Sequence, residues 1–414
     1  MKTTVCVVGG GPAGLVLGLL LARQGIQVTV LEKHADFLRD FRGDTVHPST
    51  LDVLDELDLG PAVQRLPGRA ANGLRATFDD GSFRIADFGR LRGRHRYLLF
   101  LPQWDLLDLL ADAAEQLPTF TLLRSTEAVG LIRDGSGRII GVRAVSRTGD
   151  GGTGDAPATP AEIRIEAQLT VACDGRGSTV REALGLRPLE HAAPMDVLWF
   201  RLPKPPEESE LLEMRVMAGG LMLQIDRGDY FQCAYVVPKG GFATVKGHGL
   251  TALRRQVTRM SPQLEEAVQS LQSWDDVKLL TVRIDRLRRW HAPGVLLIGD
   301  AAHAMSPIGG VGINLAVQDA VATARLLGPK LSAGTLEDAD LARVTRRRWL
   351  PTVVTQGAQR IAQARLVAPI LAADGDQDRP VRAPRVLHLL RKYPVLQAIP
   401  AYFVGKGVLP ERVR

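Results

Sequence analysis

The sequence predicts an α/β fold in which an antiparallel β-sheet is inserted into an α/β domain, with a helical region following at the C-terminus. Three observations predict it. A buried strand, a glycine-rich turn and a helix open the chain. A second strand, turn and helix of this kind occur near residue 300. Between them, residues 190–245 carry short strand-like runs that are separated by turn residues.

The first of these units begins the chain. Residues 3–8 are an apolar run typical of a buried strand, and residues 12–24 have the length and apolar content of a helix. Residues 27–31, "QVTVL", predict the next strand, which ends at Glu32. A strand, a glycine turn, a helix and a second strand in this order predict a parallel βαβ unit.

The turn of this unit contains Gly9-x-Gly11-x-x-Gly14. Gly9 permits a tight turn, Gly11 lets the backbone approach a pyrophosphate, and Gly14 lets the helix pack closely on the strand. Glu32 stands where an acidic side chain accepts a hydrogen bond from a ribose hydroxyl. The motif predicts a dinucleotide site, and both FAD and NAD fit it. An ordinary glycine turn in an α/β core is the alternative.

The rest of the α/β part is predicted from weaker patterns. Helices are expected at residues 48–57 and 103–115, and strands within residues 119–145. Residues 147–161 are rich in Gly, Pro and Thr, which predicts a surface loop between two strands. The run "IEAQLTVACDG" predicts a strand that leads into a turn at Asp174.

The inserted sheet is predicted from the runs "DVLWFRL", "LMLQI" and "YFQCAYVV", and we interpret it as the substrate domain. Residues 250–271 look helical, and residues 294–300, "GVLLIGD", predict a return to a parallel strand. The chain after about residue 335 is mainly helical in pattern. Amphipathic helices at 384–403 would cover the core, form a dimer contact or meet a membrane surface.

Composition and charge narrow the class of partner. The chain has 414 residues, 45% of them hydrophobic, which is enough for a large core and two domains. The net charge of +7 suits cofactor phosphates, while scattered basic residues and an aromatic content of 5% argue against a nucleic-acid partner. Cys6, Cys173 and Cys233 show no metal-ligand spacing, so we expect no metal site and a reducing, cytoplasmic location. No apolar run of about 18 residues occurs, so no transmembrane helix is expected.

Three further motifs occur in order along the chain. They are "FRGDTVHPSTL" at residues 41–51, "CDGRGSTVREALG" at 173–185 and "GDAAHAMSPIGGVGIN" at 299–314. Each one alone is merely a turn. Together with the first turn they resemble the single-component FAD-dependent aromatic hydroxylases, the flavoprotein monooxygenase family of para-hydroxybenzoate hydroxylase and the ubiquinone-biosynthesis hydroxylases. The resemblance covers roughly residues 1–330.

The resemblance implies an FAD-binding Rossmann-like domain of the glutathione-reductase type. It implies the following division of the chain: an FAD-binding domain at 1–75, 96–188 and 275–335, a substrate domain at 76–95 and 189–274, and a C-terminal helical region at 336–414. The second glycine-rich turn then belongs to the same site as the first, because FAD is long enough to need one turn for its pyrophosphate and another for its flavin end.

The resemblance also implies roles for single residues. Arg181 would meet the nicotinamide cofactor, NADPH or NADH. His47 is a candidate catalytic base because it follows the Arg42 segment and could reach the flavin or the substrate, and a structural histidine at a helix start is the alternative. The residues implied to bind FAD are Gly9, Gly11, Pro12, Ala13, Gly14, Glu32, Lys33, Arg42, Gln103, Val129, Asp174, Asp300, Pro307, Gly310, Val311, Gly312, Ile313 and Asn314.

The family chemistry implies the reaction. NAD(P)H reduces FAD, the reduced flavin reacts with O2, and a flavin C4a-hydroperoxide delivers oxygen to an aromatic or polycyclic small molecule. None of the five tyrosines matches the phenol-activating pair of para-hydroxybenzoate hydroxylase, so the sequence leaves substrate activation open. We expect a monomer or a homodimer.

Two other functions fit the same motifs. The first is a flavin-dependent reductase of isoprenoid or other double bonds, or a flavin halogenase, although the Trp-x-Trp-x-Ile-Pro segment of halogenases is absent. The second is an FAD-binding protein without turnover. Oxygen consumption and substrate-stimulated NAD(P)H oxidation would separate these functions from hydroxylation.

Overall fold

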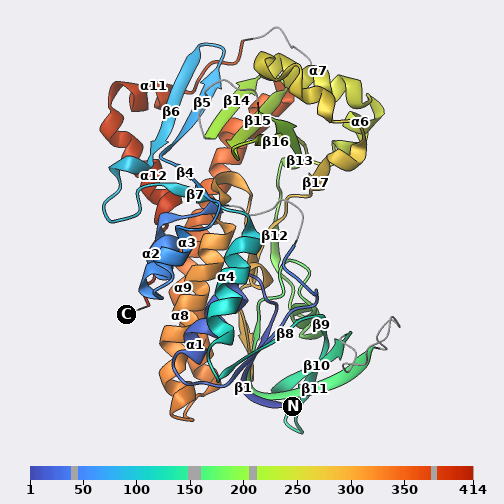
Figure 1. Ribbon diagram of the computed structural model, residues 1–414, viewed down its shortest axis with the longest axis vertical. Coiled ribbons are helices and arrows are strands. Elements are labelled where there is room, and N and C mark those ends of the chain that lie inside the picture. Colours follow the sequence, from blue (N-terminus) through green and yellow to red (C-terminus); the bar gives the residue numbers. More distant parts are fainter. Residues whose placement is uncertain (39–44, 148–159, 205–211, 374–379, 414) are drawn as a thin grey trace.

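The computed structural model describes residues 1–38, 45–147, 160–204, 212–373 and 380–413. Two large sheets organise the chain (Figure 1). One sheet lies with α1, α4 and α8 in the lower half of the view, and the other lies in the upper half beside α7. The predicted α/β class, with a second sheet and C-terminal helices, is confirmed.

The lower sheet has eight strands and a parallel centre. Its main path runs β19-β20-β11-β1-β2-β8, and the β9-β10 hairpin extends it from β11. The pairs formed by β20, β11, β1, β2 and β8 are parallel, whereas β19, β9 and β10 pair antiparallel. The strands are β1 (Lys2–Val8), β2 (Val28–Leu31), β8 (Phe120–Leu123), β9 (Thr126–Arg133), β10 (Ile139–Ser146), β11 (Ala161–Ala172), β19 (His291–Ala292) and β20 (Val295–Leu297).

Helices cover this sheet because its central strands are apolar on both faces. In α1 (Pro12–Ala22) every residue after Pro12 is buried, as expected for a helix that is apolar all round. It packs against α4 (Gln103–Glu115) and α8 (Gly312–Ser332). Three short helices complete this half: α2 (Pro48–Glu56), α3 (Gly60–Val63) and α5 (Thr179–Ala183). Two small sheets have three strands each. The first consists of β3 (Thr45–Val46), β7 (Leu98–Phe100) and β4 (Arg69–Ala71), and the second of β12 (Leu189–His191), β18 (Ile284–Arg286) and β21 (His303–Ala304).

The upper sheet has seven strands in the order β17-β13-β16-β15-β14-β5-β6. It is antiparallel as predicted, except that β14 pairs in parallel with β5. The exception arises because the β5-β6 hairpin comes from a much earlier part of the chain and adds to the edge of the sheet. The strands are β5 (Gly73–Phe78), β6 (Gly81–Asp87), β13 (Met195–Pro203), β14 (Leu212–Met217), β15 (Gly220–Asp226), β16 (Tyr230–Pro238) and β17 (Lys278–Leu280).

The two faces of the upper sheet meet different partners, because alternate side chains of a strand point to opposite faces. One face packs against α7 (Leu250–Met260), which follows α6 (Phe242–Gly247). The other packs against C-terminal segments, including α10 (Ala368–Ala372) and α11 (Arg385–Lys392). The long helix α9 (Asp338–Ala362) and a π-helical turn (Gln363–Val367) lead from the lower sheet to α10, and α12 (Ala398–Gly405) ends the helical region.

Several predicted elements are confirmed with small changes. The helix at 103–115 has the expected bounds, whereas residues 250–271 form α7 only as far as Met260 and then two 3₁₀ turns. The predicted loop at 147–161 falls largely outside the described residues. The division into domains stays a prediction. Among the described residues, no helix has the length and apolar character needed to cross a membrane.

Candidate functional site

The predicted motifs meet at one edge of the lower sheet. β1, β2, β11 and β20 are parallel, so their carboxyl ends lie at the same edge. The Gly9–Gly14 turn follows β1, Glu32 follows β2, the Asp174 turn follows β11 and the Gly299–Asp300 turn follows β20. Loops at the carboxyl ends of parallel strands are where α/β sheets bind nucleotides.

The first turn is packed so tightly that two of its glycines cannot carry a side chain. Gly9 has a φ of +105°, and a Cβ there would stand 2.5 Å from the backbone oxygen of Cys173. A Cβ on Gly14 would stand 1.9 Å from the oxygen of Gly9. Gly11 differs, because a Cβ there would meet no atom within 4 Å. The turn therefore leaves open space at Gly11, directly before the N-terminus of α1.

Glu32 is buried at the end of β2. Its carboxylate accepts hydrogen bonds from the backbone N–H groups of Gly10 and His34, each 3.1 Å long. These bonds fix the carboxylate against the first turn. Lys33, the next residue, is exposed, and Val129 of the neighbouring β9 is 43% exposed.

The Asp174 turn and the second glycine-rich turn are joined by arginines. Arg176 Nε donates to Asp300 Oδ2 at 3.1 Å. Arg181 donates to the backbone carbonyls of Ala301, at 3.1 Å, and of Arg176. Both arginines therefore tie two turns together that lie far apart in the sequence. Asp174 is largely enclosed, and this burial raises the pKa of its carboxyl group.

The second glycine-rich turn, residues 299–312, which we call the second turn, lies beside the first. A Cβ on Gly299 would stand 3.5 Å from the Cβ of Ala13 in α1. Gly309 and Gly310 have φ values of +78° and +63°, which glycine adopts without strain. Helix α8 begins at Gly312, where a Cβ would meet no atom within 4 Å. The structure thus brings a second helix N-terminus with open backbone to the site.

His47 lies under this second turn. Its ring is fully buried, and Nε2 lies 3.1 Å from the carbonyl oxygen of Gly309. Burial lowers the pKa of His47 from 6.5 to about 4, and the hydrogen bond with Gly309 offsets only part of this effect. The imidazole is therefore neutral at pH 7.

We expect His47 to make the protein less stable in mild acid. Its folded pKa lies below its unfolded pKa, so its contribution to stability is complete above pH 6.5 and is lost as the pH falls through about 4. The loss amounts to about 3 kcal/mol over that range. The free energy of unfolding, measured in urea between pH 7.5 and 4.5, should fall less steeply with decreasing pH in His47→Gln than in the unmodified protein. An equally steep fall in both proteins would contradict a lowered pKa of His47.

The remaining predicted site residues are placed as follows. Asn314 is buried, and its Oδ1 accepts hydrogen bonds from Ser49 at 2.8 Å and Thr50 at 2.9 Å, which link α8 to α2. Gln103 is the first residue of α4. Arg42 lies outside the described residues. Pro12 and Ala13 begin α1, Pro307 precedes the Ile308–Gly310 turn, and Val311 and Ile313 flank Gly312 at the start of α8.

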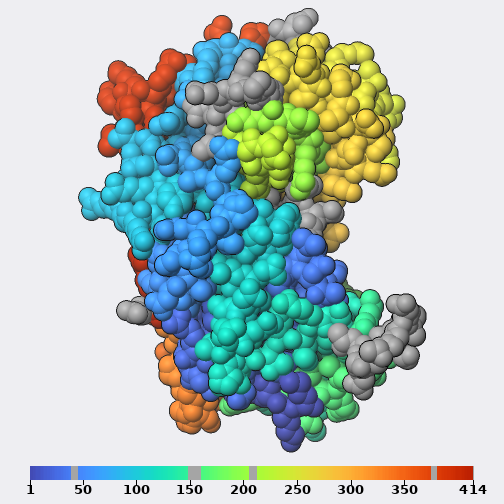
Figure 2. Space-filling view, in the orientation of Figure 1, coloured from blue at the N-terminus to red at the C-terminus, as the bar shows by residue number. Residues whose placement is uncertain are grey.

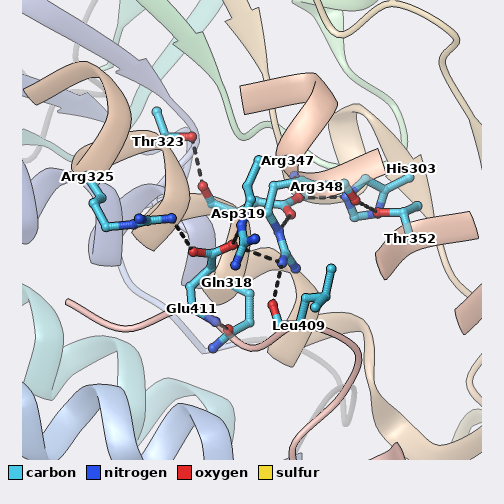
Figure 3. A network of polar contacts seen from close by, with 11 residues as sticks. His303, Gln318, Asp319, Thr323, Arg325, Arg347, Arg348, Thr352, Leu409 and Glu411 are labelled. Carbon is cyan, nitrogen blue, oxygen red and sulfur yellow. Dashed lines mark hydrogen bonds and ion pairs between the residues drawn. The ribbon is translucent and has the colours of Figure 1, made fainter. Parts of the chain in front are cut away.

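A buried polar network behind the second turn was missed by the sequence analysis (Figure 3). Asp319 of α8 accepts hydrogen bonds from the backbone N–H of Gly299, at 3.1 Å, and from Arg348 of α9, at 2.9 Å. His303 Nε2 lies 2.6 Å from the same carboxylate. Burial alone would raise the pKa of Asp319, but His303 and Arg348 hold it below its ordinary value.

The network reaches the C-terminal segment through Glu411. Arg348 contacts the Glu411 carboxylate at 3.5 Å, and Arg347 and Arg325 contact it at 2.5 and 2.7 Å. Glu411 itself is 3% exposed. Figure 3 shows Arg348 of α9 between Asp319 of α8 and Glu411 of the C-terminal segment. Because Asp319 also binds the backbone of Gly299, this network connects the second turn to both helices and to the C-terminal segment.

One sequence signal could have found part of this network. Asp319 is the single acid in the apolar run "INLAVQDAVATA", and a lone acid at a buried helix position needs a partner. Arg348 gave no such signal, because it stands in the run "RRRW" beside two other arginines. Only the fold shows that Arg348 is buried while Arg346 is exposed.

The open backbone at Gly11 and Gly312, each at a helix N-terminus, fits an elongated anionic ligand with two ends. Gly11→Ala tests this fit. The added methyl group meets no protein atom, so we expect the ligand-free protein to keep its melting temperature while the affinity for FAD falls about tenfold or more. FAD titration by fluorescence quenching measures the affinity. Gly357→Ala, in α9 with equally open space, is the control.

Comparisons with known proteins agree with this geometry. A family model described as an FAD binding domain matches residues 2–351. The chain is 35% identical over 349 residues to 6-methylpretetramide 4-monooxygenase of Streptomyces rimosus, a match that covers 84% of this chain and 80% of that protein.

Solved structures show the same fold. The anhydrotetracycline hydroxylase OxyS from Streptomyces rimosus superimposes with a TM-score of 0.72 at 26% identity, covering 98% of this chain and 76% of that one. PqsL, a probable FAD-dependent monooxygenase from Pseudomonas aeruginosa, superimposes with a TM-score of 0.73 at 23% identity, covering 91% and 100%. At that identity the likeness to PqsL shows the fold alone.

Proposed function

This chain belongs to the family defined by that FAD binding domain and is an FAD-dependent monooxygenase of aromatic compounds, and from this premise we propose its substrate class and co-substrates. The substrate is a polycyclic aromatic compound, of the kind named for the relative that acts on 6-methylpretetramide. NADPH or NADH is the electron donor, and O2 supplies the oxygen atom that enters the ring.

A partly exposed apolar surface between the upper sheet and the second turn carries this proposal. Trp199 and Leu223 lie on the sheet face away from α7, and both stay partly exposed while their neighbours are buried. Ile308 of the second turn packs against the same group of side chains. Val404 of α12 bridges from that sheet face to Met305 and its neighbours below. Apolar walls beside a cofactor site suit a large ring system.

The chain's own residues would hold FAD across the two turns. The pyrophosphate would lie at Gly11 and the N-terminus of α1, a ribose hydroxyl would reach Glu32, and the flavin end would lie at Gly312. The positive end of α8 would favour negative charge on the ring system there. When bound and reduced, FAD supplies the electrons that activate O2 for transfer of one oxygen atom.

Two residues would position this end of the site without touching the reacting atoms. His47 holds the Gly309 carbonyl, and because the imidazole is neutral it adds no charge beneath the second turn. Asp300, tied to Arg176, would present its second carboxylate oxygen to cofactor hydroxyls.

The three cysteines are unpaired, which supports a reducing, cytoplasmic location.

The test is NAD(P)H oxidation by the FAD-loaded enzyme with polycyclic aromatic probes, starting with 6-methylpretetramide and anhydrotetracycline. We expect at least one probe to accelerate NAD(P)H oxidation and to give a product one oxygen atom heavier, with label arriving from 18O2. Trp199→Ala should raise KM for that probe, while Trp349→Ala, an exposed tryptophan on α9, should leave it unchanged.

Other outcomes would replace the proposal. A product that has gained two hydrogen atoms without O2 uptake would make the protein a reductase. Label that arrives from water would overturn transfer from O2. An absence of stimulated NAD(P)H oxidation across a broad aromatic panel would favour a flavin-binding protein without turnover.

A further inference from the structure

The C-terminal helices present an apolar surface to solvent, which we call the C-terminal face. Its side chains are 46–66% exposed and come from α11, α12 and the turn between them: Val386, Leu389, Tyr393, Val395, Ile399 and Tyr402. Figure 1 shows α11 and α12 at the upper left edge, and Figure 2 shows red atoms at the molecular surface there.

The helices use their other sides to cover the upper sheet. Leu387 and Leu390 of α11 and Ala401 of α12 are buried, and both helices pack against β6. The exposed residues recur every three or four positions: 386 and 389 on α11 with 393 directly after it, and 399 and 402 on α12 with 395 in the 3₁₀ turn before it. Each short helix is therefore apolar on two sides, and only one side is needed for the core.

The charges on this segment are all of one sign. Arg382, Arg385, Arg391 and Lys392 are exposed, and residues 380–404 contain no Asp or Glu. Asp79 and Asp80 of the β5-β6 turn lie nearby. Their carboxylates accept hydrogen bonds from the backbone N–H groups of residues 381 and 383, and Asp80 also lies 3.3 Å from His388. The exposed residues between 385 and 402 are otherwise apolar or basic.

We propose that the C-terminal face binds the surface of an anionic lipid bilayer. Apolar and tyrosine side chains beside lysine and arginine are the combination with which surface helices enter the lipid headgroup layer. A second copy of the chain fits less well, because a two-fold contact would set four cations against four identical cations. This binding does not depend on the proposed substrate.

The test is flotation of the full-length, FAD-loaded protein with vesicles. We expect binding to vesicles of phosphatidylglycerol and phosphatidylcholine, weak binding to phosphatidylcholine alone, and weaker binding in high salt, which screens the electrostatic part. Arg385→Glu with Lys392→Glu should weaken binding about tenfold or more. Val395→Ser with Ile399→Ser should weaken it at every salt concentration. Lys246→Glu with Arg255→Glu, exposed on α6 and α7, is the control with the same change of charge.

Three outcomes would overturn the proposal. One is absence from anionic vesicles at low salt while bound FAD shows that the protein is folded. Another is equal loss of binding in the control variant, which would reveal attraction by overall charge. The third is a dimer in sedimentation velocity that Val395→Ser with Ile399→Ser dissociates, which would assign the C-terminal face to contact between two copies.

Discussion

Arg348→Met should destabilise the protein by about 3–5 kcal/mol and release FAD. Methionine keeps most of the side-chain volume but leaves the carboxylates of Asp319 and Glu411 in the interior without the cation between them. Removing one partner of a buried ion pair destabilises a protein by more than the intact pair stabilises it, because the remaining charge stays away from water. Asp319 would keep His303, and Glu411 would keep Arg325 and Arg347. Asp319 then holds the Gly299 N–H less firmly, and the second turn loosens.

Denaturant unfolding of the ligand-free protein and FAD retention on gel filtration measure the two effects. Arg346→Met is the matched control: it lies two residues earlier on α9 and is exposed, so both measurements should stay near those of the unmodified protein. A fall in stability with undiminished FAD retention would separate the network from the second turn. Unchanged stability would show that the buried acids find other partners.

Gly9→Ala should abolish FAD binding and reduce stability by about 3 kcal/mol or more. Two costs add. The backbone of Gly9 has a φ of +105°, which an alanine resists, and the new Cβ would stand 2.5 Å from the oxygen of Cys173. The backbone of Cys173, directly after β11, cannot move aside as a flexible side chain can, so β1, β11 and the Asp174 turn must separate.

Gly25→Ala distinguishes the effect of the backbone conformation from that of the steric clash. Gly25 also has a positive φ, of +77°, but a Cβ there would meet no atom within 4 Å. That variant should lose only about 1 kcal/mol and should bind FAD normally. Thermal unfolding and FAD titration of the two variants side by side give the comparison. Similar losses in both would mean that backbone conformation alone, and not the contact with Cys173, decides the effect.

The sequence predicted those parts of the site that depend on local pattern. Gly9, Gly11 and Gly14 between a strand and a helix define the first turn through steric demands that a short segment makes by itself. Glu32 could be placed because a parallel strand of known length ends there. The second turn needed the resemblance to a family, since nothing local states that Gly299 lies against Ala13.

Contacts between distant segments could not be predicted. The parallel pairing of β14 with β5 depends on how the chain returns to the sheet edge, and short strands do not encode it. His47 looked like a possible catalytic base, and only the fold shows that its ring is enclosed under Gly309. Burial, rather than residue type, decides what a histidine or an arginine does here.

The Glu411 contacts have a consequence for how the protein is made. The turn that Asp319 steadies is translated long before Glu411, whose carboxylate holds three arginines in the finished fold. While the C-terminal segment is still inside the ribosome, Arg348 has only one of its two acids. A nascent chain that has emerged only to residue 408 contains the strands of both large sheets yet cannot close this network. Flavin capture should therefore be a late event, following translation of the segment around Glu411 rather than of the Gly9–Gly14 motif.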